Sequence, residues 1–173
     1  MAGGAGPKIN MSSAATHTIR LRGPWQLQPL AATVLMADGT TQREARVLPP
    51  GATTQIPSDW SDSLGVDFRG RVLYSRRFGC PTGLEPADRV ALLVERVDAV
   101  AQVAVNGHPL GEIRLADGER QWSIKRLLQD RNLLEITVEL PRLTPHSTEL
   151  PRPGREGRAG GLIGEVRLVI TAG

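Results

Sequence analysis

Alternation of apolar and polar residues recurs along this chain and limits the folds that it can adopt. In the stretch LLEITVEL (133–140), the residues at every second position from Leu134 to Leu140 are all apolar. A period of two places these side chains on one face of an extended strand, with Glu135, Thr137 and Glu139 on the other. Similar β-rich runs occur at 17–23, 71–78, 89–97, 101–107 and 165–172. The pattern predicts strands that each bury one face.

Helical periodicity is almost missing, because proline and glycine interrupt nearly every candidate segment. Only residues 123–130, SIKRLLQD, favour a single helical turn. Short strands separated by Gly/Pro turns are typical of an antiparallel sandwich or barrel. We therefore predict an all-β fold, an antiparallel β-sandwich of roughly eight to ten strands.

The 173 residues suit a single domain that is large enough to bury a core. Residues 1–16, rich in Gly, Ala and Ser, are interpreted as a flexible N-terminal tail, and residues 17–173 as one β-sandwich domain. The start has no apolar stretch of the kind that a secretory signal needs, and no run is long enough to cross a membrane. A cytoplasmic location is the expectation. The single cysteine, Cys80, is interpreted as a plain buried or half-buried residue.

Two segments show no strand pattern. Residues 49–70 contain Trp60, and residues 141–161 are rich in proline, glycine and arginine. Loops of this length inside a compact domain are usually functional or disordered. Whether Trp60 and the arginine-rich loop meet at one end of the sandwich is therefore a question for the structure.

The stretch VAVNGHPLGEI (103–113) places Asn106-Gly107 between two apolar runs. This dipeptide is a strong hairpin signal, because both residues tolerate the positive φ of a type I′ turn. Pro109 cannot donate to a central ladder, so the returning strand is predicted to be an edge or to begin after Pro109. The favoured interpretation is a turn selected for its backbone geometry, and the alternative is a ligand contact through Asn106 or His108.

Several motifs resemble one known family in the same order. The stretch LEPADRVALLVERVDAVAQVAVNGHPLGEI (84–113) is similar to the sugar-binding domain of family-2 glycoside hydrolases, the group of β-galactosidases, β-glucuronidases and β-mannosidases. The flanks LRGPWQL (21–27), GRVLYSRRF (70–78), WSIKRLLQDRNLLEITVEL (122–140) and GGLIGEVRLVI (160–170) also resemble that domain. Together these motifs extend over residues 18–171.

The resemblance implies a galactose-binding-like β-sandwich, a jelly roll of two antiparallel sheets. It also implies an accessory role in carbohydrate metabolism, because the catalytic glutamates of that family lie in a separate (β/α)₈ barrel. No residue here matches them, so no catalytic residue is assigned. Two positions depart from the family pattern: Ala104 stands where a large aromatic is common, and Ser123 where an aspartate is common.

The charge distribution and the isolated histidines argue against nucleic-acid binding and against a metal or cofactor site. The net charge is +3, and the arginines are spread along the chain among acids, with few aromatics between them. Nucleic-acid binding is therefore not expected. The three histidines are isolated, so no metal site is predicted and no cofactor is expected. A structural Ca²⁺ bound by Asp59, Asp62 and Asp67 is the one alternative considered.

A sugar needs a flat aromatic for its apolar face and polar groups for its hydroxyls. Trp25 and Trp122 match apolar family positions, so a core role is favoured for both. Trp60, in a long loop, is the candidate expected to be most exposed. In the second loop Arg152, Arg155 and Arg158 are read either as solvated or as a clasp on an acidic sugar or a partner protein. The candidate carbohydrate-binding residues are Trp60, Asn106, His108, Trp122 and Arg155.

The leading hypothesis is a non-catalytic carbohydrate-binding-type module. Its partners would be a weakly bound carbohydrate or a glycosidase, with neither nucleic acid nor membrane. The rivals are a structural or protein-interaction sandwich without a sugar site, a fragment of a larger glycoside hydrolase, and a small enzyme with an unrecognised site.

Overall fold

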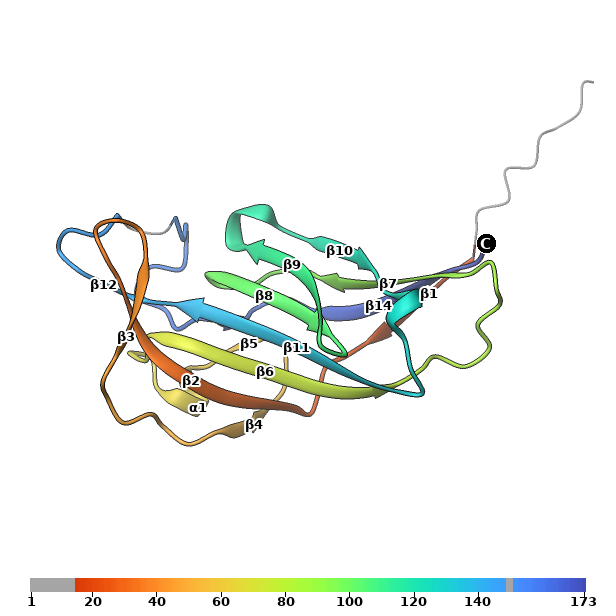
Figure 1. Ribbon diagram of the computed structural model, residues 1–173, viewed down its shortest axis with the longest axis horizontal. Coiled ribbons are helices and arrows are strands. Elements are labelled where there is room, and N and C mark those ends of the chain that lie inside the picture. Colours follow the sequence, from red (N-terminus) through yellow and green to blue (C-terminus); the bar gives the residue numbers. More distant parts are fainter. Residues whose placement is uncertain (1–14, 149–150) are drawn as a thin grey trace, which may run out of the picture.

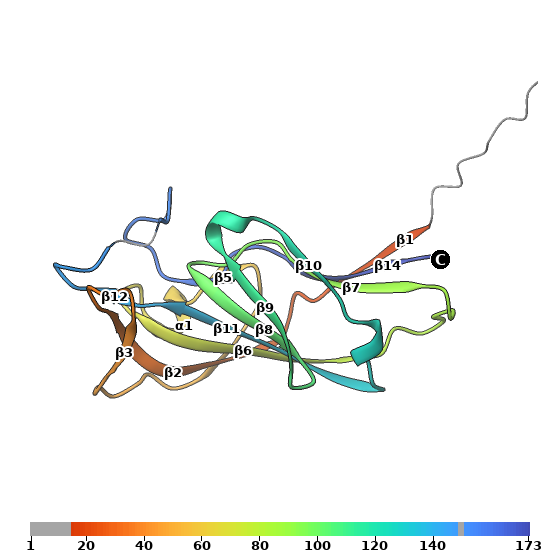
Figure 2. The same ribbon diagram turned by 45° about the horizontal axis from the view of Figure 1, so that its top comes forward.

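The computed structural model describes residues 15–148 and 151–173, and their strands form two large sheets that pack as a sandwich. The first sheet has four strands, in the spatial order β1 (Thr16–Arg20), β14 (Val166–Thr171), β7 (Arg89–Val94) and β10 (Arg120–Ser123). Figures 1 and 2 show β1 and β14 side by side at one end of the long axis, where the C-terminus also lies.

The second sheet has eight strands. Its main path runs through β12 (Arg142–Leu143), β2 (Trp25–Leu35), β6 (Gly70–Gly79), β11 (Arg131–Leu140), β8 (Val100–Val105) and β9 (His108–Arg114). Two further strands, β3 (Thr41–Glu44) and β4 (Ala52–Thr54), pair with β2. All pairs are antiparallel except that of β12 with β2. The predicted all-β antiparallel sandwich is therefore confirmed.

The remaining elements are short. They are a two-stranded sheet of β5 (Ser58–Asp59) and β13 (Gly161–Leu162), the helix α1 (Ser61–Leu64), and the 3₁₀ turns η1 (Leu115–Asp117) and η2 (Lys125–Leu127). The turn η2 lies inside the segment predicted to form one helical turn. The described part of the chain has more strands than the eight to ten expected, because segments of two to four residues also pair.

Alternation decides which side chains form the core. In β11, Leu134, Ile136, Val138 and Leu140 are at most 3% exposed, whereas the residues between them are half-buried on the opposite face. Trp25 is fully buried, which confirms its predicted core role, and its indole nitrogen donates to the Leu21 carbonyl at 2.6 Å.

The pairing register also aligns the outward side chains of the eight-stranded sheet. One row across the strands contains Gln26, Ser75, Glu135 and Ala104, and a second contains Arg71, Glu139, Val100 and Arg114. Ala104 thus lies on this outward face, where the family pattern often has an aromatic. The face is polar and has no flat ring at that position.

Candidate functional site

At one end of the sandwich, Asp98 binds two arginines and a glycine from distant segments of the chain. It lies two residues before β8 and is fully buried, and its main chain exchanges two hydrogen bonds with Gly161, at 3.0 and 2.9 Å. Its carboxylate accepts from Arg152 Nε at 2.6 Å and Nη2 at 2.8 Å, and from Arg155 Nε at 2.7 Å. Two charge-assisted partners compensate the cost of burying this carboxylate. The arginine-rich loop is therefore bound to the core at this point.

Trp60 lies at the same end. Its backbone N–H donates to the Gly160 carbonyl at 2.9 Å, and Arg155 reaches Asp59 at 3.5 Å. Trp60 is nevertheless 0% exposed, and its indole nitrogen donates to the Phe68 carbonyl at 3.3 Å. The two long loops do meet, but the expected exposure of Trp60 is wrong.

Gly160 explains why the indole is covered. A Cβ at this position would lie 2.5 Å from Trp60 Cη2 and 2.7 Å from the Asp98 carbonyl oxygen. Only a residue without a side chain lets the second loop close over the ring. In this conformation, Trp60 has no surface with which to stack on a sugar.

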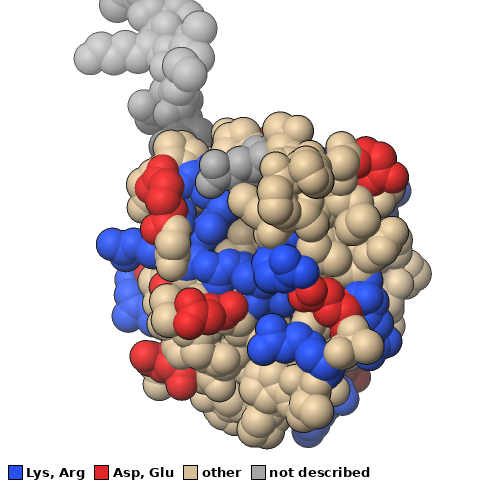
Figure 3. Space-filling view, turned by 90° about the vertical axis from the view of Figure 1, so that its left-hand side faces the viewer, with Lys and Arg blue, Asp and Glu red and all other residues tan. Residues whose placement is uncertain are grey.

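The arginines of this end differ in how well they are neutralised. Arg69 is half-buried, and its Nη1 donates to the carbonyls of Val66 and Phe68, each at 2.8 Å. Burial and the nearby positive charge of Arg152 lower the pKa of Arg69, while Asp67 and Asp98 oppose the shift. Figure 3 shows basic side chains near the centre of this end with acidic ones around them. Arg155, a predicted sugar contact, has only 12% of its side chain exposed, because Asp98 and Asp59 hold it.

Asn106 follows the other end of β8, eight residues after Asp98, or about 26 Å along an extended strand, and His108 is the first residue of β9. Asn106 has a φ of 52°, which confirms the predicted left-handed turn residue. Its side chain donates to the Leu127 carbonyl at 2.8 Å and to Asn132 Oδ1 at 2.9 Å, and it accepts from Leu133 N–H at 2.8 Å. Both polar atoms of the Asn106 side chain are thus used in hydrogen bonds within the protein, which favours the interpretation of Asn106-Gly107 as a structural turn.

The strand that follows this turn, β9, is an edge of the eight-stranded sheet, as Pro109 predicted. It begins at His108, Pro109 is opposite Ala104, and the register shifts between Val103 and Ala104. His108 is exposed. Trp122 packs against the core but is only partly buried, so its expected core role is confirmed in part. Its ring lies close to Gly111, where an added Cβ would be 3.3 Å from Nε1. The five predicted residues thus do not converge on one site.

A hollow of about 300 Å³ lies beside the Asp98 end and was not predicted. The turn between β2 and β3, the start of β8, the turn η1 and the end of β11 form its walls. The apolar side chains of the walls are those of Leu35, Ala99, Val100, Leu115, Ala116, Pro141 and Pro151. Thr41, Arg114 and Glu139 are the polar ones, and Gly39 completes the lining. We call it the Glu139 hollow.

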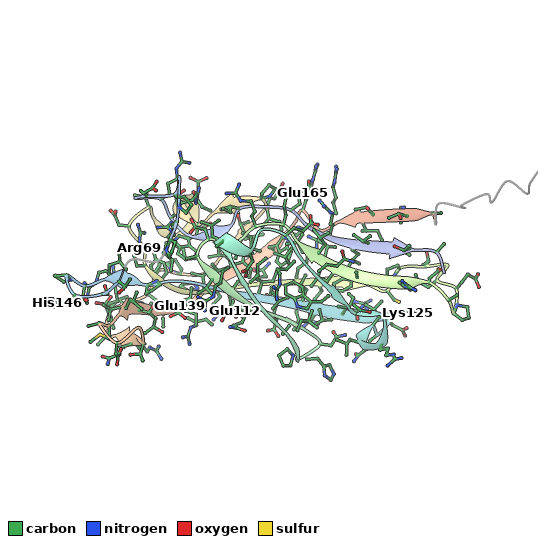
Figure 4. All side chains as sticks on the ribbon, turned by 90° about the horizontal axis from the view of Figure 1, so that it is seen from above. Arg69, Glu112, Lys125, Glu139, His146 and Glu165 are labelled. Carbon is green, nitrogen blue, oxygen red and sulfur yellow. The ribbon has the colours of Figure 1, made fainter. Side chains whose placement is uncertain are left out.

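Glu139 is the distinctive residue of this hollow. Its Oε2 pairs with Arg71 Nη2 at 3.1 Å, and only 16% of its side chain is exposed. Its Oε1 is buried and has no hydrogen-bond partner among the described residues. A buried carboxylate oxygen without a partner is unusual and calls for a donor. Figure 4 shows Glu139 in the same half of the molecule as Arg69 and Glu112.

A second, shallower hollow continues from the first across the outward face of the sheet. It shares Val100 and Glu139 and adds Gln102, Glu112 and Thr137. Glu112 Oε1 pairs with Arg114 at 2.6 Å, and its Oε2 accepts from Gln102 at 2.8 Å. The sequence pattern correctly predicted that Glu139 faces outward. It could not show that the β2–β3 turn and η1 form walls beside this residue.

The remaining sequence alternatives have simple outcomes. The described residues contain no group of three or more potential metal ligands, and Asp59 instead accepts from Ser61 and Arg155. The considered Ca²⁺ set of Asp59, Asp62 and Asp67 is therefore not assembled. Cys80 is free and half-buried, as predicted. Within residues 15–148 and 151–173, no helix is long and apolar enough to span a membrane.

Comparison with known proteins shows a shared fold. No family model and no curated protein matches the sequence. Among solved structures, the chain is similar to the FMN-binding β-glucuronidase of Facaelibacterium prausnitzii L2-6, with 24% identity and a TM-score of 0.65 over 91% of this chain and 23% of that one. The β-glucuronidase of Bifidobacterium dentium matches at 19% identity and a TM-score of 0.67, over 91% and 30%.

A rhamnosidase from Novosphingobium sp. PP1Y also matches, at 23% identity and a TM-score of 0.60, over 90% of this chain and 15% of that one. The chain thus spans between about a seventh and a third of the length of these enzymes. The resemblance to a sandwich found within glycosidases is confirmed at the level of the fold.

Proposed function

We propose that this chain, whose fold recurs as a part of β-glucuronidases, is a non-catalytic carbohydrate-binding-type module that acts with a glycoside-hydrolase catalytic unit. The observation that carries the proposal is the Glu139 hollow, in which a carboxylate lies among apolar side chains and one of its oxygens has no hydrogen-bond partner within the described residues. Its volume is at the lower end of the range of small-ligand sites.

The chemistry of the hollow suits a sugar ring. The apolar walls, which include Leu35, Leu115 and Pro151, can cover the C–H face of a ring. The Glu139 side chain, which is 16% exposed, can accept a hydrogen bond from a ring hydroxyl, and the Arg114 guanidinium, two strands away in the same cross-strand row, can donate one. Since the hollow has no aromatic platform, we expect binding to be weak, with a Kd on the order of 1 mM.

A calorimetric titration with neutral and acidic monosaccharides and short oligosaccharides tests the proposal. We expect Glu139→Gln to weaken binding about ten-fold, because an acceptor with full charge is lost. The matched control is Glu119→Gln, which removes an exposed carboxylate paired with Arg167 elsewhere. Absence of binding at tens of millimolar sugar, or equal affinity of the Glu139→Gln variant and the parent, would contradict the proposal.

One observation favours a protein-interaction role instead. Val47 is 93% exposed and Val66 is 50% exposed, and they line a shallow hollow together with Leu48 and Leu64. If this face binds a partner such as a glycosidase catalytic unit, Val47→Glu should weaken that association without affecting sugar titrations. A silent sugar titration combined with this loss would favour the interaction role.

A further inference from the structure

Two loop segments expose apolar side chains on one face of the molecule. The first, residues 46–49, follows β3, and the second, residues 64–68, begins at the last residue of α1. Both segments line the same shallow hollow. In the part of the chain that the structure describes, Val47 at 93% and Val66 at 50% are the most exposed of the large apolar residues. We call residues 46–49 and 64–68 the Val47 face.

The apolar character of the Val47 face extends beyond the two valines. Leu48, Pro49 and Leu64 are half-buried in the same hollow, and Phe68, which also lines it, is buried. Single apolar residues are common on protein surfaces, but a contiguous apolar group marks an interaction site. Covering this group removes apolar area from water, which favours association.

The same face carries one exposed charge of each sign. Arg46 precedes Val47 and Asp67 follows Val66, and both charged residues line the hollow. Neither makes an ion pair within residues 15–148 and 151–173. The nearby opposite charges have other partners, because Glu44 pairs with Arg142, and Arg69 donates to main-chain carbonyls. Arg46 and Asp67 can therefore each pair with a charge from outside the chain.

The Val47 face is complementary to itself. A two-fold axis through the hollow places residues 46–49 of one copy against residues 64–68 of the other. Val47 of each copy then packs against Leu64 and Val66 of the other. The same rotation brings Arg46 of each copy to Asp67 of the other, so that opposite charges meet twice. An isologous interface needs this kind of match within a single patch.

We propose that the Val47 face is the contact surface of a homodimer and that its occupant is a second copy of this chain. Nine residues line the hollow, whereas a stable interface uses roughly 20–30 residues on each side. We therefore expect a weak dimer, with a Kd on the order of 0.1 mM. The proposal goes beyond the proposed function, because the Glu139 hollow and its continuation share no residue with this face.

An exchange of charges tests both the dimer and its symmetry. Sedimentation equilibrium from micromolar to millimolar protein measures the Kd of the parent and its variants. Arg46→Glu and Asp67→Lys should each weaken dimerisation at least about ten-fold, because like charges then face each other at two symmetry-related positions. The double variant restores opposite charges across the axis. Its Kd should return to within about three-fold of the parent value.

A second set of variants tests the apolar contact. Val47→Glu should weaken dimerisation at least about ten-fold, because it places a charge against apolar side chains of the other copy. The matched control is Gln121→Glu, which adds the same charge at an exposed position of the four-stranded sheet and should leave the Kd unchanged. All the substituted positions are exposed, so every variant should keep the circular dichroism spectrum of the parent.

Several results overturn the proposal. The first is a parent that stays monomeric at millimolar concentration, and the second is a dimer that Val47→Glu does not weaken. A double charge variant as weak as the single ones overturns the two-fold pairing of Arg46 with Asp67. If a monomeric parent instead binds a glycosidase catalytic unit through Val47, the face has that partner and the homodimer is wrong. Sugar titrations of Glu139→Gln stay informative in each case, since the two surfaces share no residue.

Discussion

Arg152 binds the Asp98 carboxylate through two parallel hydrogen bonds, from Nε to Oδ1 at 2.6 Å and from Nη2 to Oδ2 at 2.8 Å. The two residues are 54 positions apart in the chain, and Asp98 is fully buried. This pair, with Arg155, binds the arginine-rich loop to the end of the sandwich.

Asp98→Asn should be strongly destabilising. The substitution keeps the shape of the side chain but removes the counter-charge that Arg152 binds and leaves Arg155 with Asp59, at 3.5 Å. We expect the free energy of unfolding to fall by about 3–5 kcal/mol, as when one member of a buried ion pair is removed. Urea denaturation measures this change. Glu112→Gln, at an exposed ion pair, should cost at most about 1 kcal/mol, and equal losses in the two variants would contradict the buried role of Asp98.

Trp60→Ala should unfold the end of the sandwich rather than remove a ligand contact. The indole is completely buried and makes an edge-to-face contact with Phe68 at a centroid distance of 5.9 Å. Truncation of a buried tryptophan costs about 3–5 kcal/mol. Thermal denaturation followed by circular dichroism should show a large fall in Tm for this variant and a smaller one for Trp122→Ala, at a partly exposed ring. A Trp60→Ala protein with the parent's Tm would show that the ring is not part of the core.

Asn106→Gly should separate the side-chain role of Asn106 from its backbone role. Glycine tolerates the positive φ, so the loss reflects the hydrogen bonds to Leu127, Asn132 and Leu133. We expect a cost of about 2–3 kcal/mol in the free energy of unfolding. His108→Ala, at the exposed neighbour, should change it by less than about 0.5 kcal/mol. If Asn106→Gly is neutral, the turn alone accounts for the asparagine.

Asp59 should contribute to stability against acid. Burial tends to raise the pKa of this carboxyl, but hydrogen bonds from Ser61 and the charge of Arg155 outweigh it, so the net pKa lies below its ordinary value. The folded state thus binds this proton less readily than the unfolded state. The contribution is fully present above about pH 4 and is lost as the pH falls through the lowered pKa.

Asp59→Asn should therefore reduce stability at neutral pH and make the decline in stability below about pH 4 less steep than in the parent. Urea denaturation at a series of pH values from neutral to strongly acidic measures both slopes. Identical slopes in the parent and the variant would show that Asp59 is not a source of the acid dependence.

Local patterns predicted the strands well because they depend on near neighbours in the chain. The alternation in residues 133–140 identified the buried face of β11, since a period of two is a property of any extended strand. Asn106-Gly107 identified a hairpin because few other dipeptides adopt positive φ at low cost. The long segment 49–70 was harder to interpret, because β4 and β5 are short and pair only with distant strands.

The amino-acid sequence by itself thus determined the fold class, the inward face of the main strands and the hairpin at Asn106, all through local backbone geometry. Only the tertiary structure decided that Trp60 is buried and that Asp98 binds Arg152 and Arg155. It also decided that a buried oxygen of Glu139 has no hydrogen-bond partner in the part of the chain that the structure describes. These outcomes depend on which distant segments lie side by side. Burial and charge compensation are properties of that arrangement in space, and the spacing of residues along the chain does not encode them directly.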